Sequence, residues 1–109
     1  MELTIRDYAK AARRTINPAL TWEQLRYHAA FGLASEAGEV AAIFQKAYQG
    51  HEIRQDRVID ELGDLMWFFT ELCYAMQIDP QEVLENNIDK LCKRYPDGFS
   101  MERSVHRDV

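Results

Sequence analysis

Two pairs of carboxylates, each spaced three residues apart, are the side chains in this sequence best suited to chemistry. The first pair is Glu36 and Glu39, and the second is Glu61 and Asp64. Both pairs lie in segments with helical periodicity, and residues three apart in a helix are neighbours on one face. Each pair therefore presents two carboxylates side by side, which is a pattern typical of metal ligation or acid–base chemistry.

The first carboxylate of each pair lies within an apolar stripe. At about 100° per residue, Ile43 lies about 20° from Glu36 on a helical projection. Phe68 and Leu72 lie about 20° to either side of Glu61. The second carboxylate of each pair flanks the stripe. A solvated acidic surface would place all four carboxylates opposite the stripe, so the pattern predicts two helices that pack with their carboxylates converging.

Converging carboxylates require cations. At a separation of about 6 Å and an effective dielectric of about 20, each like-charged pair costs on the order of 3 kcal/mol. Oxygen ligands without His or Cys suit a hard divalent ion, Mg²⁺ or Mn²⁺. Gly38 and Gly63 each precede the second carboxylate of a pair, and they suggest close approach of a helix or ligand, because glycine is costly inside a helix. The sequence thus predicts a metal site with four ligands: Glu36, Glu39, Glu61 and Asp64.

The composition limits the class of protein. The 109 residues are expected to form a single domain, 1–109. A chain this small buries little apolar surface alone, so oligomerisation to a homodimer or homotetramer is expected. The net charge is −5 and no long basic stretch occurs. This argues against a nucleic-acid polymer as partner, which requires a basic face, but it is compatible with a nucleotide bound through divalent cations.

The same sequence lacks signals for a membrane or for secretion. No apolar run reaches the roughly 18 residues of a membrane span, and the N-terminal segment lacks the apolar core of a signal peptide. Cys73 and Cys92 are too few for a disulfide framework, and both are expected to be buried thiols. These features predict a cytoplasmic protein with no membrane partner.

Four helices and no strand are expected. Thr21 and Gln24 match a capping box at the start of one helix, and Asp79 followed by Pro80 starts another. Two long helices joined by a short polar loop should be antiparallel neighbours. The fold class predicted is an all-α four-helix bundle whose core is completed by oligomerisation, with residues 99–109 as a loosely attached tail. The expected helices are 3–16, 21–48, 55–77 and 80–94.

With their flanking segments, the acidic pairs resemble the signature of the MazG-like nucleoside triphosphate pyrophosphohydrolases. The matching segments are 32–40, 60–65 and 90–99, within a resemblance that covers about residues 20–105. The resemblance implies a MazG-like all-α fold and metal-dependent hydrolysis of a nucleoside triphosphate to a monophosphate and pyrophosphate, in keeping with nucleotide-pool house-cleaning. Many members carry a further Glu where this chain has Ser35, which leaves open the residue that orients the water.

Several further residues are candidates for nucleotide binding. Lys46 lies two turns after Glu39 on the same flank, where it suits either a phosphate or solvent. On the last helix, Asn87, Lys90 and Arg94 border the apolar stripe. The resemblance implies that this helix contributes to nucleotide binding, and the alternative is that its cations stabilise the C-terminal end of the helix dipole.

Aromatic, acidic and imidazole side chains complete the candidates. Trp22 either stacks on a base, as the resemblance implies, or packs in the core or an interface. Asp60 is either an outer-shell base or a solvated carboxylate, and Trp67 lies off the main stripe and is predicted to face a second interface. The histidines share no ligand spacing with the carboxylates and are expected at the surface: His28, His51 and His106.

The implied mechanism is attack of a water on the α-phosphorus, with the pyrophosphate leaving group held by metal and by Lys and Arg side chains. The sequence contains no GxxxxGK[ST] segment, so a P-loop is excluded. One alternative is a di-iron helical bundle, which requires Glu-x-x-His motifs that this sequence lacks. The other is a non-catalytic oligomeric module that binds metal or nucleotide. The sequence does not specify the base or the sugar.

Overall fold

The computed structural model describes residues 2–106, and this part of the chain contains five helices and no strand. The all-α fold class is therefore confirmed. The first helix is shorter than expected, the third ends two residues early, and a fifth helix forms in the segment predicted as a loose tail. The helices are α1 (Ile5–Arg13), α2 (Trp22–Tyr48), α3 (Gln55–Ala75), α4 (Pro80–Arg94) and α5 (Met101–Val105).

Side-chain caps set where the first two helices begin. The predicted capping box of α2 is present: Gln24 N–H donates to Thr21 Oγ1 at 3.1 Å, and Thr21 N–H donates to Gln24 Oε1 at 3.0 Å. A second box, formed by Thr4 and Asp7 with bonds of 3.0 and 3.2 Å, starts α1. This box satisfies the first N–H groups of α1 and explains why the helix begins at Ile5 instead of at residue 3.

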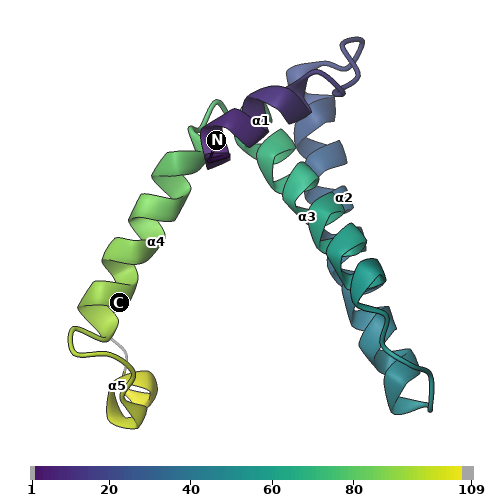
Figure 1. Ribbon diagram of the computed structural model, residues 1–109. Coiled ribbons are helices and arrows are strands. Elements are labelled where there is room, and N and C mark those ends of the chain that lie inside the picture. The colour runs from purple at the N-terminus through teal and green to yellow at the C-terminus, as the bar shows by residue number, and fades with distance from the viewer. Residues whose placement is uncertain (1, 107–109) are drawn as a thin grey trace.

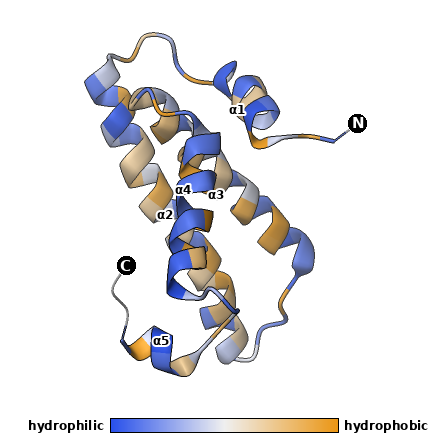
Figure 2. Cartoon of the chain, turned by 90° about the vertical axis from the view of Figure 1, so that its left-hand side faces the viewer, coloured by the Kyte–Doolittle hydropathy of each residue, from blue (hydrophilic) through white to orange (hydrophobic). Residues whose placement is uncertain are grey.

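Helices α2 and α3 form an antiparallel hairpin joined by the short connection 49–54, and they lie side by side along their length (Figure 1). Helix α1 packs across the end of the hairpin that lies away from this connection. Coloured by hydropathy, α2 and α3 carry most of the apolar patches (Figure 2). The core is small and sits where the three helices meet; its buried apolar residues are Ala9, Leu25, Ala29, Cys73 and Ala75.

The close approach of the two long helices occurs at Gly32. A Cβ added at Gly32 would overlap the ring of Phe68 on α3, so only glycine leaves room for this aromatic side chain. Gly38 and Gly63 were expected to mark close approach, but a Cβ at either one would meet no described atom within 4 Å. Within one chain, those two glycines border open space.

Two side chains make contacts that the sequence did not predict. His28 lies at the surface as expected, with about half of its side chain exposed, but its Nδ1 also lies 2.9 and 3.0 Å from the two carboxylate oxygens of Glu71. The Glu71 side chain is only 1% exposed, and a buried carboxylate requires such a partner. Trp67 is half-buried within the chain and donates from Nε1 to Thr15 Oγ1 at 2.8 Å, and its place at a second interface stays a prediction.

Helix α4 extends away from the hairpin as a separate arm (Figure 1). It is attached to α1 through Arg6, whose guanidinium donates to Asp79 at 2.8 Å and lowers the pKa of that carboxyl. None of the α4 residues is buried. The radius of gyration is 17.1 Å, against about 13 Å for a compact chain of this length. A closed four-helix bundle is therefore not formed within one chain.

The two cysteines differ in their burial. Cys73 is buried as expected, whereas Cys92 is exposed on the α4 arm, where no helix covers it. Burial raises the pKa of the Cys73 thiol. Within residues 2–106, no helix is both long enough and apolar enough to cross a membrane.

Candidate metal centre

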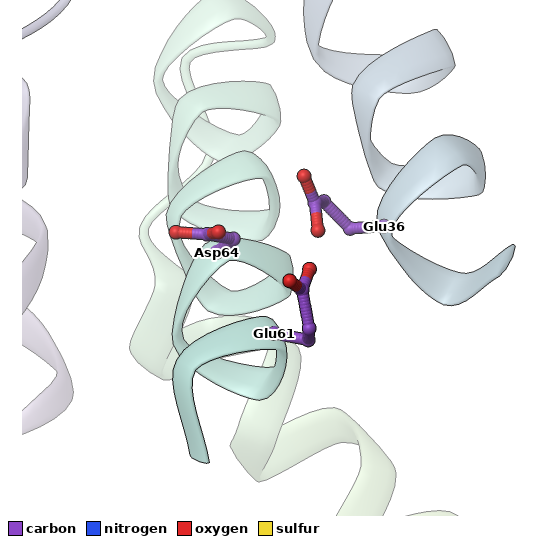
Figure 3. A group of neighbouring side chains, drawn as sticks. All are labelled: Glu36, Glu61 and Asp64. Atoms are coloured by element: carbon purple, nitrogen blue, oxygen red, sulfur yellow. The ribbon is translucent and has the colours of Figure 1, made fainter. Parts of the chain in front are cut away.

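Three of the four predicted carboxylates meet across the hairpin. We call Glu36, Glu61 and Asp64 the acidic cluster, because one carboxylate oxygen from each lies within 4.8 Å of the others. Glu36 reaches from α2 toward α3, where it faces Glu61, with Asp64 one turn further along the same helix (Figure 3). The prediction that these side chains converge is therefore matched by the structure.

The packing of α2 on α3 sets the spacing of the cluster. Gly32 lies one turn before Glu36, and Phe68 lies one turn after Asp64. The contact between Gly32 and the Phe68 ring brings the helix backbones together one turn away from the carboxylates. Glu36 and Glu61 are half-buried as a result, whereas Asp64 is exposed at the edge.

The electrostatics of the cluster are those of an unneutralised acidic site. The pKa of Glu36 is raised from 4.5 to about 7, first because Glu36 hydrogen-bonds to Glu61 and next because of burial. The charges of Glu61, Asp64 and Glu39 raise it further. Glu36 Oε2 is buried and accepts no hydrogen bond from any described residue. The nearest cation recorded for Glu61 is Arg57, at 3.8 Å from Nη2 to Oε1.

This donor set fits a hard divalent cation. The orphan oxygen of Glu36 needs a positive partner, because an unpaired buried carboxylate oxygen is costly. The cluster contains only carboxylate oxygens, which are the ligands that Mg²⁺ and Mn²⁺ prefer. Glu36, Glu61 and Asp64 are the residues that would hold such an ion.

The fourth predicted ligand, Glu39, lies outside this tight cluster. It is exposed, three residues along α2, and lines a pocket at the connected end of the hairpin. Lys46 lines the same pocket, so the predicted proximity of these two side chains is present. Asp60 is exposed on α3 outside the cluster, and Ser35 is exposed beside Glu36.

The remaining predicted site residues lie far from the cluster in the same chain. Trp22 is at the start of α2, 14 residues before Glu36, which corresponds to ~21 Å along the helix. It lines a pocket of about 560 Å³ near the turn between α1 and α2, with its ring centroid 5.2 Å from that of Tyr74. Asn87 and Lys90 are exposed on the α4 arm and Arg94 is half-buried near its end, so none of the three joins the cluster.

Two residues near the cluster were missed by the sequence analysis. Arg57 precedes Glu61 by four residues, and this spacing is itself a signal for a helical ion pair. Burial, followed by the charge of the nearby Asp64 carboxylate, raises the pKa of Tyr8 on α1. No local pattern in the sequence links Tyr8 to Asp64, which lies 56 residues later.

The fold and the cluster together describe an all-α protein with an acidic site across a helical hairpin. The family model of the MazG nucleotide pyrophosphohydrolase domain matches residues 28–99, about two thirds of the chain, including both acidic pairs. The chain belongs to this family, which confirms the resemblance and assigns it to the nucleotide pyrophosphohydrolases at the family level. Comparison with curated proteins gave no match, and comparison with solved structures gave none either.

Proposed function

We propose that this protein hydrolyses a nucleoside triphosphate to a monophosphate and pyrophosphate in a reaction that requires Mg²⁺ or Mn²⁺. The observation that carries the proposal is the acidic cluster, with three carboxylate oxygens within 4.8 Å of one another and one buried oxygen that has no hydrogen-bond partner among residues 2–106. Family membership supports nucleotide pyrophosphohydrolysis in general, and the cluster supports its dependence on a divalent cation.

The residues of the hairpin have distinct roles in this proposal. Glu36, Glu61 and Asp64 hold the cation, and Glu39 adds a carboxylate from the exposed edge of α2. When bound, a divalent cation supplies Lewis-acid polarisation of phosphate oxygens and of water. Asp60, one turn before Asp64, is the candidate to orient the attacking water, because Ser35 offers only a hydroxyl group.

Residues for the nucleotide come partly from another copy of the chain. Helix α4 diverges from the hairpin of its own chain (Figure 1), and it carries Asn87, Lys90 and Arg94. The arm also leaves large apolar residues exposed, including Leu84 and Ile88. In a homodimer or homotetramer, these apolar side chains are covered and the polar α4 residues reach the acidic cluster of a partner. Trp22 is too far from the cluster of its own chain, so it stacks on the base of a nucleotide that is bound at the cluster of a partner.

The metal requirement is tested by Glu36→Gln and Glu61→Gln, which keep the side-chain volume and remove the ligand charge. Each variant should lose pyrophosphate release in the presence of Mg²⁺ while keeping the far-ultraviolet circular dichroism of a helical protein. Glu23→Gln, on an exposed position of α2, is the matched control and should retain full activity. Unchanged turnover in either cluster variant refutes the metal site. If the wild-type protein binds metal and nucleotide but shows no turnover, the non-catalytic module is supported instead.

The bond that is cleaved is tested with isotopically labelled water. Attack at the α-phosphorus places ¹⁸O in the monophosphate, and pyrophosphate remains unlabelled. Label in pyrophosphate indicates attack at the β-phosphorus, and release of orthophosphate indicates cleavage at the γ-position. Either of these results overturns the assigned reaction. A panel of canonical, deoxy and modified triphosphates then determines the base and sugar, and tests a role in house-cleaning of the nucleotide pool.

The shared site is tested by mixing two inactive variants. Glu36→Gln and Lys90→Ala chains are unfolded together and refolded. If α4 of one chain serves the cluster of the other, each mixed dimer contains one intact site, and random pairing restores about a quarter of the wild-type activity. Mixtures that stay inactive show that Lys90 acts within its own chain. Light scattering that finds a stable 12.7 kDa monomer at micromolar concentration refutes the oligomer itself.

A further inference from the structure

The pocket that Glu39 and Lys46 line, next to the acidic cluster, gathers basic side chains. This pocket, which we call the hairpin pocket, has a volume of about 240 Å³ and lies between the end of α2, the connection 49–54 and the start of α3. Its polar and charged lining consists of four basic and two acidic side chains: Lys46, His51, Arg54, Arg57, Glu39 and Glu52. With His51 counted as neutral, the convention that gives the chain its net charge of −5, three cationic and two anionic side chains leave the pocket slightly positive.

The hairpin pocket borders the acidic cluster. Glu39 lines the pocket and also contributes to the raised pKa of Glu36. On the other helix, Arg57 lines the pocket and its guanidinium lies 3.8 Å from Glu61. The pocket and the cluster are therefore neighbours, with Glu39 and Arg57 at the border between them. Lys46 is two turns beyond Glu39, ~10 Å along the helix.

The backbone of the connection holds these cations in place. The N–H of His51 donates to the carbonyl of Lys46 at 3.0 Å, which folds the connection back onto the end of α2. Arg54 is the N-cap residue of α3, so the first turn of that helix places its backbone, whereas its side chain makes no cap hydrogen bond. Lys46 and Arg54 consequently approach the pocket from opposite sides of the hairpin.

The cations of the pocket are available to an anion. Among the described residues, no ion pair is recorded for Lys46, and Arg54 pairs only with Asp56 at 2.7 Å. Both partners of that pair are about two-thirds exposed, and such exposed pairs are weak. Arg57 makes a single long contact with Glu61, which leaves most of its five N–H groups for another acceptor.

We propose that the hairpin pocket binds the terminal two phosphates of the substrate, and that pyrophosphate occupies it before release. Lys46 and Arg54 contact the phosphate oxygens directly, and Arg57 bridges the pocket and the cluster. This inference rests on the proposed function for the substrate, but it assigns a subsite that neither the carboxylates nor α4 provide. A diphosphate carries several negative charges in a small volume, and Arg and Lys are the side chains that recognise such groups.

The test is calorimetric titration with inorganic pyrophosphate in the presence of Mg²⁺, which requires no turnover. Lys46→Ala and Arg54→Ala should each weaken pyrophosphate binding by about tenfold, because each removes a charged hydrogen-bond donor. Binding of a nucleoside monophosphate should stay unchanged in both variants. Arg103→Ala, which removes an exposed cation on α5, is the control and should bind pyrophosphate as the wild type does.

The outcomes separate this inference from the proposed function. The pocket assignment is wrong if both variants bind pyrophosphate as tightly as the wild type. It is also wrong if they lose monophosphate binding to the same extent as pyrophosphate binding. Either result counts against the pocket even when the wild type releases pyrophosphate from a triphosphate. If the variants lose pyrophosphate binding while the wild type releases none, the pocket stands and the proposed reaction fails. Thermal unfolding of each variant checks that a weaker binding constant does not reflect misfolding.

Discussion

Metal binding to the acidic cluster should depend steeply on pH near neutrality. The reason is Glu36, whose pKa of about 7 in the metal-free protein lies well above its ordinary value of 4.5. Below pH 7 this carboxyl is mostly protonated, and a divalent cation has to displace the proton before it can use Glu36 as a ligand. We therefore predict that lowering the pH from 8 to 6 weakens the binding of Mg²⁺ or Mn²⁺.

The expected magnitude follows from the fraction of Glu36 that is ionised. With a pKa of about 7, roughly nine-tenths of the groups are ionised at pH 8 and roughly one-tenth at pH 6. The apparent affinity should fall by about tenfold, which corresponds to about 1.4 kcal/mol. A set of carboxylates with ordinary pKa values is fully ionised over this range, and its affinity for the metal would barely change.

The same shift has a consequence for the stability of the metal-free protein. The folded state holds the Glu36 proton more tightly than the unfolded state, so this group stabilises the fold at low pH. That contribution is fully present below about pH 4.5 and is lost as the pH rises through about 7. Added metal should therefore raise the melting temperature more at pH 8 than at pH 6.

The assay is titration of the protein with Mn²⁺, followed by electron paramagnetic resonance of the free ion, at pH 6, 7 and 8. Glu36→Gln should bind more weakly at every pH and lose the steep dependence, because it has no proton to displace. Glu23→Gln should behave as the wild type. A wild-type affinity that is the same at pH 6 and pH 8 would show that Glu36 ionises normally, and the reasoning from its burial and its hydrogen bond to Glu61 would be wrong.

Two substitutions test the packing that positions the cluster. Gly32→Ala should lower the free energy of unfolding by about 1–3 kcal/mol in urea titrations, because its methyl group collides with the Phe68 ring; an unchanged midpoint would show that the ring moves freely. His28→Ala should cost about 3 kcal/mol, because it leaves the buried Glu71 carboxylate without its partner. The double variant His28→Ala/Glu71→Leu should recover part of that loss, and a double variant as unstable as His28→Ala alone would contradict this account.

The hairpin and its acidic cluster were predictable because they depend on local rules. The period of the apolar stripe defines which face of each helix is buried, and the short connection makes the helices antiparallel neighbours. Together these fix the register, in which Gly32 faces Phe68 and His28 faces Glu71. Glu36 follows Gly32 by one turn, so this register places it opposite Glu61 and Asp64.

The contacts that sequence reasoning missed depend on which particular side chains meet across the hairpin. Whether a glycine is required depends on the side chain that faces it, and Gly32 faces a large ring whereas Gly38 faces open space. His28 was placed at the surface because it shares no ligand spacing with the paired carboxylates, and its partner Glu71 was missed because it is 43 residues away. The divergence of α4 was also missed, because an amphipathic stripe shows that a helix face needs cover but does not show which chain covers it.

Glu71 and Glu36, both on the α2–α3 interface, show how a structural carboxylate differs from a site for a ligand. Glu71 is the more deeply buried, yet both of its oxygens lie within hydrogen-bonding distance of His28 Nδ1, so its carboxylate has a polar partner within the chain. Glu36 is less buried, but it faces other carboxylates and retains an oxygen without a partner. Burial alone would have ranked Glu71 as the functional residue. The missing partner is what distinguishes Glu36 from Glu71, and a metal ion would supply that partner.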